Sequence, residues 1–122
     1  MKRNESKEDY LEAILVLKEQ NKEVGQIDIA KYLDFSKPSV SLAMKNLSEG
    51  DLIEIKTNGS IDFKEKGYEI AKEVYERHTI LRSFLIKLGV SFKNADTDAC
   101  QIEYVISNES FEKIKKLYKS LE

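Results

Sequence analysis

The fold of this chain is decided by residues 35–47, which read FSKPSVSLAMKNL. Ser36 predicts a helix N-cap, and Pro38 fits the first turn because the amide hydrogen that it lacks has no partner there. Helical spacing divides the segment into two faces. The apolar face carries Val40, Ala43, Met44 and Leu47, and the outer face carries Pro38, Ser41, Leu42 and Lys45. Because the outer face has no acid before Glu49, we expect it to lie against phosphates and base edges of DNA.

Two helices are predicted upstream of this segment. Residues 6–9 read SKED, a capping-box pattern with Ser6 as the N-cap, and open a first helix that runs to about residue 21. Residues 27–33 read IDIAKYL and predict a short amphipathic helix. The expected inward side chains are Leu11, Ile14, Leu15 and Leu17 in the first helix and Ile27, Ala30 and Leu33 in the second. The break at residues 34–35 fits the tight turn of a helix-turn-helix.

A β-hairpin is predicted directly after the outer-face helix. Residues 52–56 and 61–63 are strand-like, and Asn58-Gly59 between them indicates a type I′ turn, which needs positive φ at both central residues. The order helix, helix, helix, hairpin is typical of a winged helix-turn-helix. The competing interpretation is a small helical domain that merely includes a hairpin.

The remaining sequence predicts three striped helices. A long helix from about Lys66 carries an apolar stripe with one histidine, and Gly89 is expected to end it. Its stripe comprises Ile70, Val74, His78, Leu81, Leu85 and Leu88. Two further helices are expected, at residues 94–106 and from residue 107 onward. The last of them carries a stripe of Phe111, Ile114, Leu117 and Leu121. Because these helices are too few to close a core alone, we expect a second copy of the chain to cover them.

Composition excludes several classes of protein. The chain has 122 residues, a formal charge of −2 and a single cysteine, which excludes an intrachain disulfide. No segment approaches the ~18 consecutive apolar residues of a membrane helix, and charges follow Met1 where a signal peptide needs an apolar core. We therefore expect a cytoplasmic protein with no membrane association. Positive charge is available locally, at Lys37, Lys45 and Lys56, and a dimer or neutralised acids would strengthen binding to DNA.

Five polar side chains on three predicted helices could converge on a divalent transition metal. Asp9 and Glu12 are one turn apart in the first helix. Cys100 and Glu103 have the same spacing in the fifth, and His78 interrupts the stripe of the long helix. Each residue alone has a simpler explanation. Asp9 fits a capping box, Glu12 a solvated acid, and His78 and Cys100 ordinary core positions. Spacing by itself is therefore a weak metal signal.

Several blocks of sequence support a more specific interpretation. They are SKEDYLEAI (6–14), DIA (28–30), KPSVS (37–41), KEKG (64–67), RHTILRSFL (77–85), LGV (88–90) and ACQIEYVIS (99–107). In order and spacing they resemble the diphtheria-toxin-repressor family of metal-dependent bacterial repressors. The similarity is greatest to its short manganese-sensing branch, the manganese transport regulators. It covers nearly the whole chain, although the printed sequence ends before the SH3-like third domain of the longer iron regulators.

The resemblance implies that a metal bridges the first helix to the dimerisation helices. The ligands that it implies in this chain are Asp9, Glu12, His78, Cys100 and Glu103. Cys100 is similar to the iron-responsive branch, because the manganese branch typically has glutamate there. Tyr104 stands where the family has a histidine, and a phenol is a poor ligand at neutral pH, so one of two adjacent metal positions is expected to be weakened or absent. With a mixed donor set, Mn2+ and Fe2+ rank as near equals and Zn2+ ranks behind.

Together these observations predict a mainly α protein. A winged helix-turn-helix DNA-binding domain at residues 1–70 is followed by an all-helical metal-binding and dimerisation domain at residues 71–122. The predicted function is that of a homodimeric, metal-responsive repressor, which binds a double-stranded DNA operator and controls genes of manganese or iron homeostasis. The expected DNA contacts are Ser36, Lys37, Ser39, Ser41 and Lys45 in the helix and Lys56 and Asn58 in the wing, with Ser39 and Ser41 nearest the bases.

Three alternatives remain open at this point. The first is a metal-independent winged-helix regulator whose metal site has drifted and which responds to redox through Cys100; the departure at Tyr104 supports it. The second is an enzyme that uses the metal cluster for hydrolysis. It is disfavoured because no activated nucleophile or general base accompanies the cluster, and we expect no enzymatic activity. The third is a winged helix that binds another protein.

Overall fold

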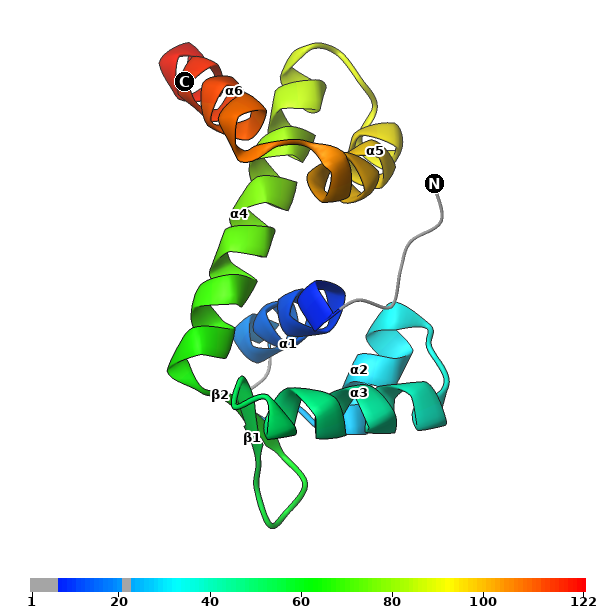
Figure 1. Ribbon diagram of the computed structural model, residues 1–122. Helices are drawn as coiled ribbons and strands as arrows, with labels where there is room; N and C mark the ends of the chain where they lie inside the picture. The colour runs from blue at the N-terminus through cyan, green and yellow to red at the C-terminus, as the bar shows by residue number, and fades with distance from the viewer. Residues whose placement is uncertain (1–6, 21–22) are drawn as a thin grey trace. The chain divides into compact units, whose positions relative to one another are not determined.

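The computed structural model describes residues 7–20 and 23–122. Figure 1 shows helices throughout this part of the chain and one small antiparallel sheet. The residues form two compact units with a boundary between Glu73 and Val74. We call them the N-terminal unit and the C-terminal unit. No helix of the described ranges combines the length and the apolar content that crossing a membrane requires.

The N-terminal unit is a winged helix-turn-helix. It contains α1 (Lys7–Gln20), α2 (Gln26–Leu33), α3 (Lys37–Glu49), β1 (Ile53–Ile55) and β2 (Ile61–Phe63). The strands pair in antiparallel register, Ile53 with Phe63 and Ile55 with Ile61. The buried core includes Tyr10, Leu11, Ile14, Ile29, Val40, Met44, Leu47, Ile53 and Ile61. Figure 1 shows the hairpin extending beyond α3 as the wing. Ser6 and residue 21, at the two predicted ends of the first helix, lie outside the described residues.

Helix α3 forms as its sequence predicts. The Ser36 hydroxyl accepts a hydrogen bond from the Ser39 N–H at 3.2 Å, which caps the first turn, and Pro38 lies in that turn. Val40, Met44 and Leu47 are buried and Ala43 is half-buried, whereas Pro38, Ser41, Leu42 and Lys45 are exposed. The division into an apolar inner face and a polar outer face is confirmed.

The predicted inward face of α2 is wrong at one position. Ile27 is 57% exposed, whereas Ile29, which the prediction omitted, is completely buried. At about 100° per residue, Ile29 and Leu33 point to the same side of the helix and Ile27 lies about 200° away from Ile29. Asp34 then adopts a left-handed conformation (φ 58°) and ends the helix, as the turn of a helix-turn-helix requires.

The hairpin forms where predicted, but its turn is not type I′. Lys56 N–H donates to the Ser60 carbonyl at 2.8 Å, and Gly59 N–H donates to the Lys56 carbonyl at 2.8 Å. Residues 57–59 therefore make a three-residue loop. Such a loop needs a left-handed residue only at its last position, and Gly59 supplies it with φ 88°, while Asn58 does not have a positive φ.

The C-terminal unit packs three helices around a small core. Helix α4 (Glu65–Lys87) enters it from residue 74 onward, followed by α5 (Phe92–Val105) and α6 (Asn108–Leu121). The buried centre consists of Ile80, Leu81, Ala99 and Phe111, flanked by Ile102, Ile106, Ile114 and Tyr118. Helix α5 begins two residues earlier than predicted because Ser91, and not a later residue, caps it by accepting from the Asn94 N–H.

Gly89 ends α4 as predicted. Its φ is 105°, its N–H donates to the Ile86 carbonyl at 2.9 Å, and the Val90 N–H donates to the Leu85 carbonyl at 3.0 Å. These two bonds form a Schellman motif. Leu88 was expected in the buried stripe of this helix, which is wrong: it follows the last helical residue, so the stripe does not reach it, and it is exposed.

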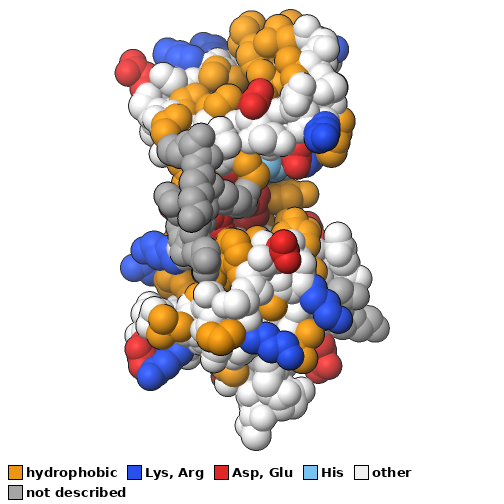
Figure 2. Space-filling model, turned by 90° about the vertical axis from the view of Figure 1, so that its right-hand side faces the viewer, with side chains coloured by type: hydrophobic (Ala, Val, Ile, Leu, Met, Phe, Trp, Pro, Cys, Tyr) orange, Lys and Arg blue, Asp and Glu red, His pale blue; other side chains and the backbone are white. Residues whose placement is uncertain are grey.

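Much of the apolar surface of the C-terminal unit remains exposed. Its exposed large hydrophobic residues are Ile86, Leu88, Phe92, Val105, Leu117 and Leu121. Figure 2 shows hydrophobic side chains over the surface of this unit, at the top of the view. Exposed apolar area of this kind marks a surface that another molecule covers.

Candidate metal centre and nucleic-acid interface

Three of the five candidate metal ligands lie together in the C-terminal unit. His78 comes from α4, and Cys100 and Glu103 come from successive turns of one face of α5. One ligand atom from each residue lies within 4.8 Å of the other two. His78 and Glu103 are buried, with 8% and 7% of their surfaces exposed, and Cys100 is half-buried. The structure thus brings together an imidazole, a thiol and a carboxylate.

The His78 ring lies between two carboxylates. Its Nδ1 is 3.2 Å from Glu103 Oε1, and its Nε2 is 2.9 Å from Asp96 Oδ1. Arg82 Nη1 donates to the same Asp96 oxygen at 3.0 Å. Sequence reasoning missed Asp96 and Arg82, although helical spacing offered a signal. Arg82 follows His78 by four residues and Asp96 precedes Cys100 by four, so each lies on the face of a ligand candidate.

The environment of Asp96 favours its charged form. Burial raises the pKa of this carboxyl, but the hydrogen bonds from His78 and Arg82 outweigh the burial and hold the pKa below its ordinary value. Asp96 is therefore a carboxylate at neutral pH, and it accepts hydrogen bonds from both neighbours.

Asp9 and Glu12 belong to the N-terminal unit. They lie one turn apart on α1, and only 1% and 8% of their surfaces are exposed. A cation that reached these two buried carboxylates would compensate for the loss of water around them. That they share a metal with His78, Cys100 and Glu103 remains a prediction.

The donor set fits a divalent transition metal. Imidazole, thiolate and carboxylate are ligands of zinc and of other first-row metals. Donor atoms that share one ion at about 2.0–2.3 Å lie at most about 4.6 Å apart, which is close to the observed limit of 4.8 Å. Tyr104, which follows Glu103, is half-buried.

The outer face of α3 is suited to a polyanion. Lys37, Ser41 and Lys45 are exposed along it, and Glu49, which is exposed in the last turn, is the one acid of this helix. Ser36 is also exposed, but its hydroxyl caps the helix and donates to the Ser39 hydroxyl at 2.9 Å. Ser39 is half-buried. The hydroxyls of Ser36 and Ser39 are thus hydrogen-bonded to each other, whereas Lys37, Ser41 and Lys45 take no part in the cap.

The two wing candidates have partners within the N-terminal unit. Lys56 Nζ is 2.7 Å from Asp62 Oδ2, while Lys18 Nζ of α1 lies 2.5 Å from Asp62 Oδ1. Hydrogen bonding to Asp62 raises the pKa of Lys56, and hydrogen bonds from Lys18 and Lys56 lower the pKa of Asp62. Asn58 Oδ1 accepts from the Ser60 N–H at 3.0 Å and stabilises the turn. Both candidates remain exposed.

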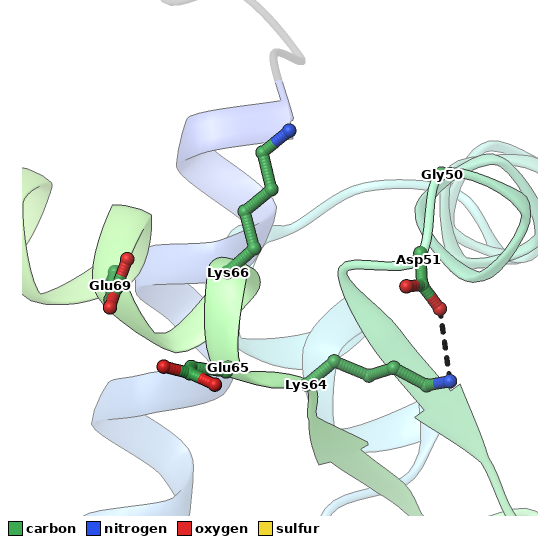
Figure 3. Close-up of a pocket in the computed structure, with 6 residues that line it drawn as sticks. All are labelled: Gly50, Asp51, Lys64, Glu65, Lys66 and Glu69. Atoms are coloured by element: carbon green, nitrogen blue, oxygen red, sulfur yellow. Dashed lines mark ion pairs between the residues drawn. The ribbon is translucent and has the colours of Figure 1, made fainter.

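A surface pocket in the N-terminal unit contains none of the candidate residues. It is lined by Gly50, Asp51, Lys64, Glu65, Lys66 and Glu69 (Figure 3). In this view Lys64 extends toward Asp51, and the two form an ion pair of 2.9 Å that links the end of α3 to the start of α4. Because its lining alternates in charge, the pocket offers no consistent set of ligands for one ion.

Comparison with known proteins identifies two matching segments. Residues 3–60 match a family model described as the N-terminal DNA-binding domain of iron-dependent repressors. Residues 64–122 match the model of the metal-binding and dimerisation domain of the same repressors. The candidate DNA contacts fall in the first match, and His78, Cys100 and Glu103 fall in the second.

Individual relatives agree with these matches. The transcriptional regulator MntR of Escherichia coli is 36% identical over 110 residues, which are 90% of this chain and 71% of the relative. An uncharacterised HTH-type transcriptional regulator of Methanocaldococcus jannaschii is 33% identical over 92% of this chain and 91% of its own length. The solved structure of the manganese regulator SloR superposes with a TM-score of 0.82 at 28% identity, over 98% of this chain. The chain spans about half of that structure, 55% of its length.

Proposed function

Because this chain belongs to the family of iron-dependent repressors, the diphtheria-toxin-repressor family, we propose that it is a homodimeric repressor that binds its operator when loaded with Mn2+ or Fe2+. Family members are transcriptional regulators and not enzymes. The observation that carries the proposal is the cluster of His78, Cys100 and Glu103 within the segment matched by the metal-binding domain. Because its proposed ligand is chromosomal DNA, we place its action in the cytoplasm.

In the proposed mechanism, Asp9 and Glu12 of α1 complete the ligand set of His78, Cys100 and Glu103. A bound divalent cation would supply positive charge that neutralises these acids. The five side chains would then hold α1 to α4 and α5, so that the two recognition helices of a dimer would keep a fixed spacing. Fixed spacing favours simultaneous binding of both half-sites, and fewer uncompensated acids reduce the repulsion of phosphate.

The donor set leaves Mn2+ and Fe2+ as the leading candidates. Carboxylates and imidazole suit both ions, whereas the Cys100 thiolate shifts relative affinity away from manganese and toward iron or zinc. The structure of SloR is that of a manganese regulator, while the matching domains are named for iron. Zn2+ ranks behind both because three of the five proposed ligands are carboxylates.

On the DNA side, we propose that α3 enters the major groove. Lys37 and Lys45 would contact phosphates, and Ser41 would lie nearest the base edges together with Ser39. The capping role of Ser36 orients the first turn, and its hydroxyl would contact the backbone. Lys56 and Asn58 would bring the wing to the flanking backbone or minor groove. The exposed apolar residues of the C-terminal unit would form the homodimer interface.

The test is operator binding titrated separately with Mn2+, anaerobic Fe2+ and Zn2+. Duplexes selected from a random pool by the metal-loaded protein would serve as operator. We expect Mn2+ or Fe2+ to raise the affinity at least about tenfold, within the usual range of such couplings, and chelation to reverse the effect. Binding that is equally tight after chelation would instead support a metal-independent regulator.

A pair of matched variants assigns the metal response to the cluster. Glu103→Gln removes one charged ligand, so it should abolish the response. Glu112→Gln makes the same change at an exposed position of α6 and should retain it. Equal responses in the two variants would contradict the proposed ligand set.

A further inference from the structure

The two nitrogens of the His78 ring have different surroundings. Nδ1 lies 3.2 Å from Glu103, which belongs to the cluster of ligand candidates, and Nε2 lies 2.9 Å from Asp96, which does not. A neutral imidazole carries its proton on one nitrogen and offers a lone pair only at the other. The partner of the protonated nitrogen therefore decides which nitrogen can bind a metal.

From this geometry we infer that Asp96, anchored by Arg82, is a positioning residue that holds the His78 proton on Nε2 and presents Nδ1 to the metal. The inference rests on the proposed function, because it concerns the same site. Asp96 acts through the histidine ring and is not itself one of the metal ligands. Its task is to select the tautomer and to fix the orientation of the ring before the ion arrives.

Arg82 makes Asp96 suited to this task. Its Nη1 donates to the same Oδ1 that accepts from His78, at 3.0 Å, and its guanidinium lies 5.3 Å from the centre of the Phe92 ring. Asp96 is 43% exposed at its side chain and would rotate freely without such an anchor. With a cation already bound to it, this carboxylate is also a poorer ligand for a second ion.

An ordinary structural ion pair between α4 and α5 is the competing explanation, and the sequence offers a direct way to separate the two. His78 is the only histidine in the chain. Long-range 1H–15N correlation spectra of protein labelled at histidine therefore report the tautomer of this one ring without assignment. The measurement needs no metal and is made at a pH where the ring is neutral.

Three variants complete the experiment: Asp96→Ala, Asp96→Asn and the control Asp98→Ala, which changes an exposed acid two residues along the same helix. In the unaltered protein and the control we expect the proton on Nε2. In both Asp96 variants the Nδ1–H form should gain population, and the affinities for Mn2+ and for diamagnetic Zn2+, measured by competition with a chelator, should fall about 10- to 100-fold. Thermal unfolding shows that each variant is folded.

Each outcome decides the inference. An Nδ1–H tautomer in the unaltered protein would overturn it, as would Asp96 variants that lose thermal stability yet keep both tautomer and metal affinity. A tautomer that shifts together with metal affinity in the Asp96 variants alone supports it. Failure of the proposed function has a separate signature, because operator binding by the unaltered protein would then not respond to metal, whatever the tautomer of His78.

Discussion

Helices α3 and α6 are both amphipathic and both capped by serine, but their apolar faces differ in how far they are buried. In α3 the inward side chains Val40, Met44 and Leu47 are buried within the N-terminal unit. In α6 only Phe111 is buried, and Leu117 remains 52% exposed. The difference shows which unit is complete on its own. The apolar face of α3 is buried within its own unit, so its outer face is available to a ligand. Helix α6 still exposes apolar area that a second chain can cover.

We expect the largest loss of stability from a substitution in the buried face of α3. Met44→Ala leaves a cavity in a fully buried position of α3 and should lower the free energy of unfolding by about 2–5 kcal/mol. Leu42→Ala removes an exposed side chain of the same helix and should change it by less than about 0.5 kcal/mol. Urea unfolding followed by circular dichroism measures both, and equal losses would show that the two faces of α3 are not distinct.

The oligomeric state tests whether the exposed apolar face of α6 belongs to the dimer interface. Leu117→Lys places a charge in the apolar area that we assign to the dimer, and burial of a leucine is worth about 1.5–3 kcal/mol. Sedimentation equilibrium should show at least about a tenfold rise in the dimer dissociation constant. Lys113→Ala, at an exposed polar position of α6, is the control. An unchanged dissociation constant in the Leu117 variant would show that this residue lies outside the dimer interface.

The packing of the N-terminal unit also depends on the first turn of α4. A Cβ at Gly67 would collide with the backbone of Leu52, whose carbonyl carbon would be only 2.8 Å away. Gly67→Ala should therefore destabilise the protein by about 1–3 kcal/mol, as overpacking does. Gly25→Ala has ordinary space, with its nearest atom at 3.7 Å, and should have the smaller effect in the same urea experiment. Similar midpoints for the two variants would refute the close packing.

The outer face of α3 is tested by salt dependence. Lys45→Ala should weaken operator binding and flatten the dependence of log affinity on log salt by about one charge, because one phosphate contact is lost. Fluorescence anisotropy at several salt concentrations measures the slope. Lys116→Ala on α6, exposed but far along the chain, should leave it unchanged. If Lys45→Ala left the slope unchanged, Lys45 would make no contact with a phosphate.

The smallest effect concerns the pairing of α1 with the wing. The pKa of Asp62 is lowered below its ordinary value of 3.8, so its pairs stabilise the fold above that pH and are lost as pH falls through the lowered value. Because all three partners are partly exposed, the contribution of these pairs to stability is small. Asp62→Asn should remove this part of the acid dependence of the unfolding midpoint. Identical pH profiles for the variant and the unaltered protein would show that the pairs contribute nothing.

The sequence-based predictions were most accurate where the deciding residues lie close together in the sequence. The start of α3 was predictable because Ser36 and Pro38 act within one turn. The turn type of the wing was not, because Asn58-Gly59 does not specify the loop length. In α2, an eight-residue helix, the small apolar set left the inward direction ambiguous, and Ile29 was missed. Asp96 and Arg82 were missed because their role depends on how α4 packs against α5.

The pairing of Lys56 with Asp62 has a consequence for how the wing would meet nucleic acid. A lysine that already has a counterion exchanges one negative partner for another when it approaches a phosphate, and the net electrostatic gain is small. Asp62 would still have Lys18 as its partner after such an exchange, so no carboxylate would be left unbalanced. The wing can therefore move on and off the sugar-phosphate backbone at little energetic cost, which suits a contact that adjusts register more than it adds strength.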